Sequence, residues 1–184
     1  VGTPRERLWK VRAGQVVLAQ GSIERPLVFD GNDRPGVMLA GAARTYLNRY
    51  GVTVGERAVV VTSHDSAWLA AFDMAKAGVK VEAIVDLRSD PSVDLQERAR
   101  VLGIQILVGW TVTGTRGRLR IKSVRVCPVD LGGDAHILSC DVLLMCGGWT
   151  PSLHLFSHSM GKLRWDESEQ RFLPGDHVEA SRTV

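Results

Sequence analysis

A short loop after an apolar run has the spacing of a phosphate-binding loop but lacks its glycines. Thr62, His64 and Ala67 follow the segment AVVV, residues 58–61, at the three glycine positions of a G-x-G-x-x-G pattern. In that pattern the first glycine allows a tight turn, the second lets the backbone approach a pyrophosphate, and the third permits close helix–strand packing. The segment therefore has the frame of a dinucleotide-binding loop without its usual residues.

The three replacements oppose a pyrophosphate to different degrees. Ala67 is compatible with such a loop, whereas Thr62 adds a β-branched side chain and His64 places an imidazole where the pyrophosphate would lie. The imidazole either blocks this position or donates to a phosphate, and we favour blocking. Ser63 or Asp65 is expected to cap the following helix, where a carboxylate would also repel phosphate.

Asp86 is the second candidate of this unit. It lies 24 positions after Thr62, near the distance at which a dinucleotide site places its ribose-binding acid. Without a phosphate loop before it, we expect Asp86 to be a solvated residue at a strand end. The degenerate nucleotide loop, predicted not to bind a nucleotide, therefore comprises Thr62, Ser63, His64, Asp65, Ala67 and Asp86.

The other reactive side chains are isolated. His154 and His158 are four positions apart on a predicted helix, but no third ligand stands at a readable spacing, so no metal site is predicted. The cysteines Cys127, Cys140 and Cys146 form no C-x-x-C pair, and an odd number is a poor disulfide framework. Because the chain also lacks a G-x-S-x-G elbow, a Walker loop and an H-E-x-x-H motif, no catalytic residue is assigned.

The loop lies within segments that alternate between strand and helix patterns. Glycines at 51, 78 and 103 stand where three predicted helices end. The β-α-β-α-β order predicts a parallel, right-handed, doubly wound sheet. The predicted strands are AVVV, VKVEAIVDL and IQILVG, and the predicted helices cover residues 39–50, 66–77 and 95–102.

Antiparallel strands are predicted next. The segment TVTGTRGRLRIKSVRVCPVD alternates with period two and has turn residues at Gly114 and Gly117, which is typical of a meander. DVLLMCGG, residues 141–148, predicts another buried strand, and Thr150-Pro151 predicts the start of a helix. One strand face would carry Arg116, Arg118, Arg120 and Lys122, which we interpret as a solvated face rather than a phosphate or partner patch.

The two ends of the chain carry weaker patterns. Residues 7–19 predict two short strands separated at Ala13-Gly14, and the segment from Gly161 predicts short strands and turns. The sequence stops at EASRTV without a closing element, so we expect the chain to be a fragment of a longer protein.

Composition excludes several classes of protein. The chain has 184 residues, of which 45% are hydrophobic and 23% charged, as in soluble globular proteins. Its 23 Lys and Arg against 20 Asp and Glu give a net charge of +3, too small to indicate nucleic-acid binding. No apolar run has the roughly 18 residues of a membrane helix. With no signal-like segment and no disulfide framework, a cytoplasmic location is expected.

Two stretches resemble a known superfamily. GQVVLAQGSIERPLVFDGNDRPGV is similar to the passage with a strand, A-T-G-A and R-P in two-dinucleotide-domain flavoproteins. CDVLLMCGGWTPSLHLF is similar to the strand that closes their second nucleotide domain. More specifically, the segment from RERLWK to LNRYGV and the segment CGGWTPSLHLFSHSMGKLRWDE resemble the α subunit of heterotetrameric sarcosine oxidase.

The resemblance implies an architecture. The fold would be α/β, a Rossmann-like three-layer FAD/NAD(P)-binding domain with a parallel sheet and an antiparallel β-meander. Residues 1–36 would be a remnant of the first dinucleotide domain, and residues 37–158 an inserted second nucleotide-binding domain with a degenerate loop. Residues 159–184 would return to the first domain.

The resemblance also implies cofactors and partners. The α subunit of that family carries NAD, here mostly through missing upstream residues, while FAD and FMN belong to the full complex. The candidate cofactor-proximal residues are Gly21, Ser22, Gly147 and Gly148, although AQGS departs from A-T-G-A at Gln20 and Ser22. The expected partners are other subunits of a hetero-oligomeric oxidase, not nucleic acid or a membrane.

The function implied is a mainly structural role within an enzyme that oxidatively demethylates sarcosine, with no activity expected from the fragment alone. Two alternatives stay open. One is a subunit of a related two-domain flavoprotein of the hydrogen cyanide synthase, opine oxidase or NADH-dependent reductase type. The other is a non-enzymatic interaction module that reuses a Rossmann frame.

Overall fold

A computed structural model describes residues 5–130 and 132–175. The chain divides into two compact units, Glu24–Trp149 and the flanking residues up to Ile23 together with those from Thr150. We describe each unit by itself. The assignment of residues 1–36, 37–158 and 159–184 to two dinucleotide domains stays a prediction.

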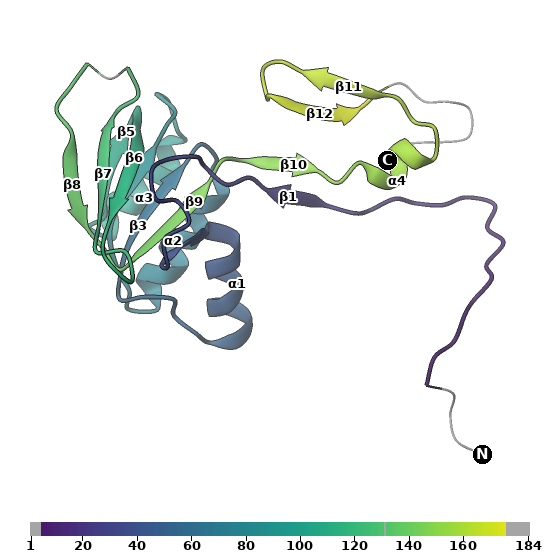
Figure 1. The fold of residues 1–184 in the computed structure, drawn as a ribbon, viewed down its shortest axis with the longest axis horizontal. Helices are drawn as coiled ribbons and strands as arrows, with labels where there is room; N and C mark the ends of the chain where they lie inside the picture. The colour runs from purple at the N-terminus through teal and green to yellow at the C-terminus, as the bar shows by residue number, and fades with distance from the viewer. Residues whose placement is uncertain (1–4, 131, 176–184) are drawn as a thin grey trace. The chain divides into compact units, whose positions relative to one another are not determined.

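A five-stranded parallel sheet forms the centre of the Glu24–Trp149 unit (Figure 1). The central strand β3 pairs with β9 from Ala58 opposite Val142 to Thr62 opposite Cys146. All residues of β9 are buried, which explains why this strand is a continuous apolar run. In spatial order the strands are β2 (Val37–Leu39), β9 (Val142–Cys146), β3 (Arg57–Thr62), β4 (Lys80–Asp86) and β5 (Gln105–Val108).

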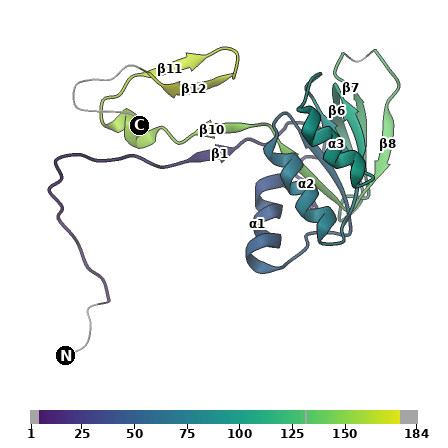
Figure 2. The ribbon, with the colours of Figure 1, turned by 180° about the vertical axis from the view of Figure 1, so that it is seen from behind.

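Different layers cover the two faces of this sheet. The helices α1 (Ala40–Tyr50), α2 (Ser66–Lys76) and α3 (Val93–Val101) lie on one face (Figure 2). A three-stranded antiparallel sheet, β6 (Trp110–Arg116), β7 (Ser123–Pro128) and β8 (His136–Ser139), packs on the other. Alternation along β3 places Val60 against the helices and Val59 against the meander. The predicted three-layer fold is confirmed.

Two details of the predicted architecture are corrected. The sheet is not doubly wound, because the meander occupies the face that further helices would cover. Gly114 lies inside β6 at a shift in strand register, and the turn begins only after Arg116. The basic residues therefore share no strand face. Arg120 instead donates to the carbonyl oxygens of Asp141 and Val54, at 3.0 and 2.9 Å.

The predicted helices are confirmed with small shifts at their ends. Gly51 adopts a φ of 65° after α1, and its N–H donates to Leu47 O while Val52 N–H donates to Tyr46 O. Glycine adopts this left-handed backbone conformation without the steric cost of a Cβ. Glycine placement therefore predicted where α1 stops.

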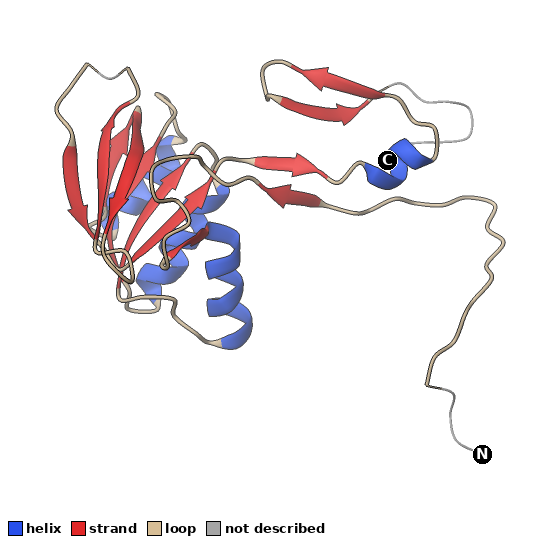
Figure 3. Ribbon diagram, in the orientation of Figure 1, coloured by secondary structure: helices blue, strands red, loops and turns tan. Residues whose placement is uncertain are grey.

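The flanking unit departs more from the sequence patterns (Figure 3). Residues 7–19 form no strand, since no described residue pairs with them in a ladder. Thr150-Pro151 lies in β10 (Trp149–Pro151), which pairs with β1 (Ser22–Glu24), and the short helix α4 is His154–His158. The hairpin of β11 (Leu163–Asp166) and β12 (Arg171–Pro174) confirms the predicted strands after Gly161. The terminal EASRTV lies outside the described residues.

Across residues 5–130 and 132–175, none of the helices combines the length and apolar character that crossing a bilayer requires.

Candidate functional site

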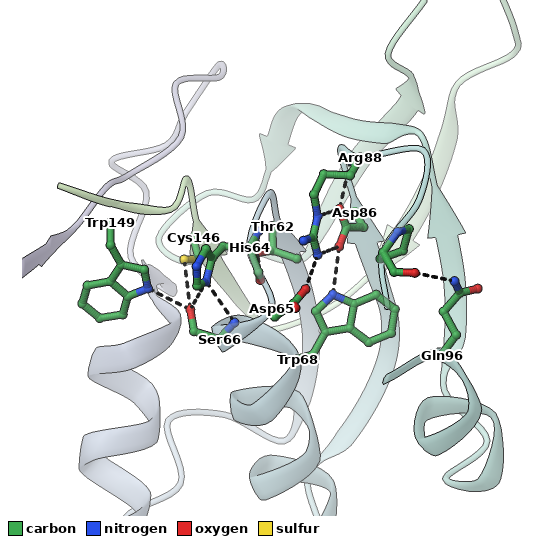
Figure 4. A network of polar contacts seen from close by, with 11 residues as sticks. Thr62, His64, Asp65, Ser66, Trp68, Asp86, Arg88, Gln96, Cys146 and Trp149 are labelled. Atoms are coloured by element: carbon green, nitrogen blue, oxygen red, sulfur yellow. Dashed lines mark hydrogen bonds and ion pairs between the residues drawn. The ribbon is translucent and has the colours of Figure 1, made fainter. Parts of the chain in front are cut away.

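The degenerate loop joins β3 to α2 at the carboxyl end of a central parallel strand, where open α/β sheets bind ligands (Figure 4). Thr62 is fully buried there. Its Oγ1 accepts a hydrogen bond from the His64 N–H at 2.9 Å and donates to His64 O at 2.8 Å. The threonine hydroxyl therefore closes a turn that glycine would form in a phosphate-binding loop.

The imidazole of His64 caps helix α2. Its Nδ1 accepts the backbone N–H of Ser66 at 3.1 Å and lies 3.0 Å from Ser66 Oγ. Unpaired N–H groups at a helix N-terminus are what a bound phosphate would use. The prediction that Ser63 or Asp65 caps this helix is wrong, because the N-cap residue Asp65 makes no side-chain cap hydrogen bond.

The neighbouring backbone donors are also satisfied within the chain. Ser63 N–H donates to Cys146 O at 3.0 Å, Ala67 N–H to His64 O at 3.4 Å, and Trp68 N–H to Asp65 O at 3.1 Å. A phosphate placed at this loop would compete with these internal acceptors, so its hydrogen bonds would be exchanged rather than gained.

Asp86 is fully buried, so the prediction of a solvated strand-end residue is wrong. Its carboxylate accepts from Trp68 Nε1 at 2.8 Å and from Arg88 through the backbone N–H, Nε and Nη2 at 2.8 to 3.0 Å. The acid that would hold a ribose hydroxyl is thus occupied by the protein itself. Burial is tolerated because the charge is paired and hydrogen-bonded.

Arg88 links this acid to the loop. Its Nη2 lies 2.7 Å from Asp65 Oδ1 and 2.8 Å from Asp86 Oδ2, so one guanidinium bridges the ends of β3 and β4 (Figure 4). Hydrogen bonds to Asp86 raise the pKa of the Arg88 guanidinium further above its ordinary value. Sequence reasoning missed Arg88 and Trp68. The available signal was the D-x-R spacing, since an Arg near this acid accommodates the 2′-phosphate in NADP sites.

The strand end at Gly147 and Gly148 is shaped by local packing. A Cβ on Gly147 would lie 3.1 Å from Arg25 O and 3.2 Å from Leu27 Cδ2, and Gly148 has a φ of 88°. Arg25 N–H also donates to Gly148 O at 2.9 Å. Both glycines are therefore explained by the backbone approach of the segment that follows β1.

The other candidates lie elsewhere. Gly21, with a φ of 70°, accepts the Ser152 N–H at 3.0 Å within the flanking unit, and Ser22 begins β1. His154 and His158 lie on α4, and the described residues include no group of three or more His, Cys, Asp or Glu that could hold a metal.

All three cysteines are free and buried. Burial raises the pKa of the Cys146 thiol, and the nearby Glu24 carboxylate raises it further. Such a thiol stays protonated and is a poor nucleophile.

The layers and strand order give this chain the fold that is found in FAD/NAD(P)-binding reductases. T. acidophilum thioredoxin reductase has a TM-score of 0.62 and 16% identity, with 80% of this chain and 47% of that chain covered. The ferredoxin reductase for the CYP199A2 system of Rhodopseudomonas palustris has a TM-score of 0.61 and 18% identity, covering 83% and 39%. These likenesses concern the fold alone.

Among curated proteins, the chain is homologous to a segment of the alpha subunit of sarcosine oxidase, which confirms the resemblance. It is 44% identical over 173 residues to the Rhizobium meliloti protein, covering 94% of this chain and 17% of the relative. Against the protein of Corynebacterium sp. (strain P-1) the identity is 43% over 178 residues, covering 94% and 18%. The chain therefore spans less than a fifth of these relatives.

A weaker match is an opine oxidase subunit of Agrobacterium tumefaciens. It is 27% identical over 183 residues, covering 89% of this chain and 36% of the relative. No protein-family model matches the chain.

Proposed function

We propose that the chain is part of the NAD-carrying α subunit of a sarcosine-oxidase-like flavoenzyme, and that its Glu24–Trp149 unit is a structural domain that binds no dinucleotide at its own loop. The observation that carries the second statement is the internal satisfaction of the loop. His64 occupies the helix N-terminus and Arg88 occupies the ribose-binding acid.

Binding energetics support this reading. A dinucleotide would have to displace the His64 imidazole from Ser66 N–H and the Arg88 guanidinium from Asp86, which is fully buried. Separating a buried charge from its partner costs about 3–5 kcal/mol. The Asp65 carboxylate would also repel an incoming phosphate. These costs exceed what a few exchanged hydrogen bonds return.

The cofactors are assigned to other parts of the assembly. NAD would be held by the first dinucleotide domain, to which residues 1–36 and 159–184 would contribute, with Gly21 and Ser22 near the cofactor. FAD and FMN would belong to the full complex, whose flavin oxidises the N-methyl group of sarcosine. Because the relatives are named as subunits, we propose that this chain packs against other subunits of a hetero-oligomeric oxidase.

Calorimetric titration of the 184-residue chain with NAD, NADH and FAD tests the proposal. We expect no saturable heat at ligand concentrations up to about 1 mM, a Kd that corresponds to a binding free energy of about −4.1 kcal/mol. Micromolar NADH binding that is lost in the His64→Leu variant would overturn the proposal. It would show that Thr62–Ala67 is a working phosphate loop and favour a reductase.

The second candidate is part of an opine-oxidase-like enzyme, favoured by the match to the opine oxidase subunit of Agrobacterium tumefaciens. The longer protein, assembled with its partners, distinguishes the two through its substrate. Oxidation of sarcosine supports the first candidate, and oxidation of an opine supports the second.

A further inference from the structure

Basic side chains gather on the turn that joins β6 to β7. We call residues 116–122, RGRLRIK, the basic turn. The expected solvated strand face required a strand that continues to Lys122, but β6 ends at Arg116 and β7 begins at Ser123. The turn lies within residues 98–129, a segment that contains no Asp or Glu. The exposed basic side chains of the turn are Arg116, Arg118, Arg120 and Lys122.

The charges of the basic turn have no acidic partner among the described residues. The ion pairs of residues 5–130 and 132–175 include none of its basic side chains. Arg120 donates to two carbonyl oxygens, which are neutral acceptors, so no carboxylate pairs with its charge. Asp141, whose carbonyl is one of them, uses its carboxylate to accept the backbone N–H groups of Glu56 and Arg57. The basic turn therefore presents an excess of positive charge to its surroundings.

The backbone of the basic turn is held in place by the core and by the segment before β2. Ile121 is 1% exposed, and its N–H donates to Pro35 O at 2.9 Å. Arg34 donates through Nε to Thr115 Oγ1 at 3.0 Å and through Nη1 to Gly117 O. A surface that is already ordered loses less conformational entropy when a partner binds, so the basic turn is suited to recognition.

An apolar side chain lies among these charges. Leu119 is 82% exposed and stands between Arg118 and Arg120 in the chain. Protein interfaces combine an apolar centre with a polar rim, and arginine is enriched in them. Residues 111–148 contain no Phe, Trp or Tyr on which nucleic-acid bases could stack, and the net charge of the chain is only +3. These features favour an acidic protein surface over a nucleic acid as the partner.

The basic turn lies at the end of the parallel sheet away from the connections to the flanking unit. Arg120 contacts Asp141 immediately before β9. The connections leave from the other end, where Trp149 follows β9 and Arg25 N–H donates to Gly148 O. The five residues of β9 span roughly 16 Å between these ends. Because the chain continues from the opposite end of the sheet, a separate subunit is favoured as the occupant of the basic turn.

We propose that the basic turn is a docking surface for an acidic segment of a partner subunit. Carboxylates of that segment would pair with Arg116, Arg118 and Lys122, and an apolar side chain would cover Leu119. This inference rests on the proposed function, which places the chain in a hetero-oligomer, and adds the surface and the charge of the contact. Exposed charges act mainly on the rate of association, and salt screens them.

The first experiment uses the longer protein and its partner subunits, purified separately, and measures the association rate constant and the Kd. Arg118→Glu places a negative charge opposite the acidic segment, so the Kd should rise about tenfold, mainly through slower association. Arg100→Glu on α3 is the matched control, since Arg100 is also exposed and has no ion pair among the described residues. It should change the Kd by less than about twofold.

Ionic strength tests the same contact without a substitution. Raising it from about 0.01 to 0.15 M shortens the distance over which charges act from about 30 to 8 Å. Association of the wild type should therefore slow at the higher value, and Arg118→Glu should show a smaller dependence.

Leu119→Ser tests the apolar contact independently of charge. The Kd should rise about tenfold because the leucine no longer leaves water on binding, while the salt dependence stays that of the wild type. Val101→Ser, at a side chain that is likewise exposed, is the control and should not change the Kd. A greater loss of stability in Leu119→Ser than in Val101→Ser, measured on the longer protein alone, would show that its own chain covers the turn and would overturn the proposal.

Unchanged partner binding in both Arg118→Glu and Leu119→Ser would also overturn the proposal, as would association of the wild type that does not respond to salt. An effect of Arg118→Glu on binding to single-stranded DNA or to phosphatidylserine vesicles, but not to the partner subunits, would assign the turn to a nucleic acid or a membrane instead. These outcomes leave the proposed function intact. Failure of the longer protein to bind any partner subunit would contradict both.

Discussion

Two buried carboxylates in the same domain differ in how completely the protein satisfies them. Asp86, with no exposed surface, accepts four hydrogen bonds and pairs with Arg88. Glu24, 7% exposed, accepts a hydrogen bond from the Gly41 N–H, lies against the Cys146 thiol and has no ion-pair partner among the described residues. The first arrangement compensates the burial of the charge fully, and the second compensates it only in part.

The comparison also shows that the position of a residue in the fold and the availability of its polar groups to a ligand are separate properties. The Asp86 region has the position of a dinucleotide site, yet its groups bind one another. Glu24 belongs to no recognisable motif, yet its carboxylate has fewer partners than that of Asp86. The position of a residue in a fold therefore indicates where a ligand could bind, whereas its hydrogen bonds show whether its polar groups are still available to one.

The largest expected change in the free energy of unfolding comes from replacing each of the two acids by its amide. Asp86→Asn weakens a buried charge pair and should lower the free energy of unfolding by about 2–4 kcal/mol. Glu24→Gln removes an unpaired buried charge and should change it by less than about 1 kcal/mol in either direction. Urea unfolding at pH 7 measures both. Equal losses would show that the two acids are satisfied to the same extent.

Thr62→Val tests the hydroxyl that closes the loop. The valine methyl leaves the His64 N–H without its acceptor at the fully buried side chain of residue 62, so a loss of about 1–2 kcal/mol is expected. Thr53→Val, at an exposed position, is the matched control and should stay within about 0.5 kcal/mol. A loss no greater than the control's would mean that the turn forms without the Thr62 hydroxyl.

Much of the fold was predictable because local patterns determine it. The apolar run at 58–61, the glycine after α1 and the alternation along the meander follow from strand burial, helix termination and strand period. Residues 7–19 show where this reasoning fails. An alternating pattern forms a strand only with a neighbour to pair with, and the described residues supply none.

The site was less predictable because its contacts join distant segments. His64 was expected to obstruct a phosphate, but its hydrogen bond to Ser66 N–H depends on the loop conformation. The pairing of Arg88 with both Asp65 and Asp86 depends on β3 and β4 ending side by side. Local sequence patterns do not show how deeply Asp86 is buried. The expectation that Asp86 is a solvated residue was therefore wrong.

The buried thiol of Cys140 extends the comparison to the pH dependence of stability. Burial, followed by the Asp141 charge, raises the pKa of its thiol from 9.0 to about 12. The unfolded thiol ionises first as pH rises, so this contribution to stability is complete below pH 9 and is lost between pH 9 and 12. At pH 10 the loss should be about 1.4 kcal/mol. Urea unfolding of Cys140→Ala should lack this part of the pH slope, whereas Cys127→Ala should retain it.

The smallest expected effect concerns the helix cap. His64→Ala removes the acceptor of Ser66 N–H and should destabilise the chain by about 0.5–1 kcal/mol, as loss of an N-cap does. Ser63→Ala, whose hydroxyl makes no hydrogen bond among the described contacts, is the control and should be neutral. The freed helix N-terminus would then be open to anions, so added phosphate should restore part of the lost stability in His64→Ala and not in the wild type. Equal stabilisation of both proteins would show that the imidazole does not occupy the anion position.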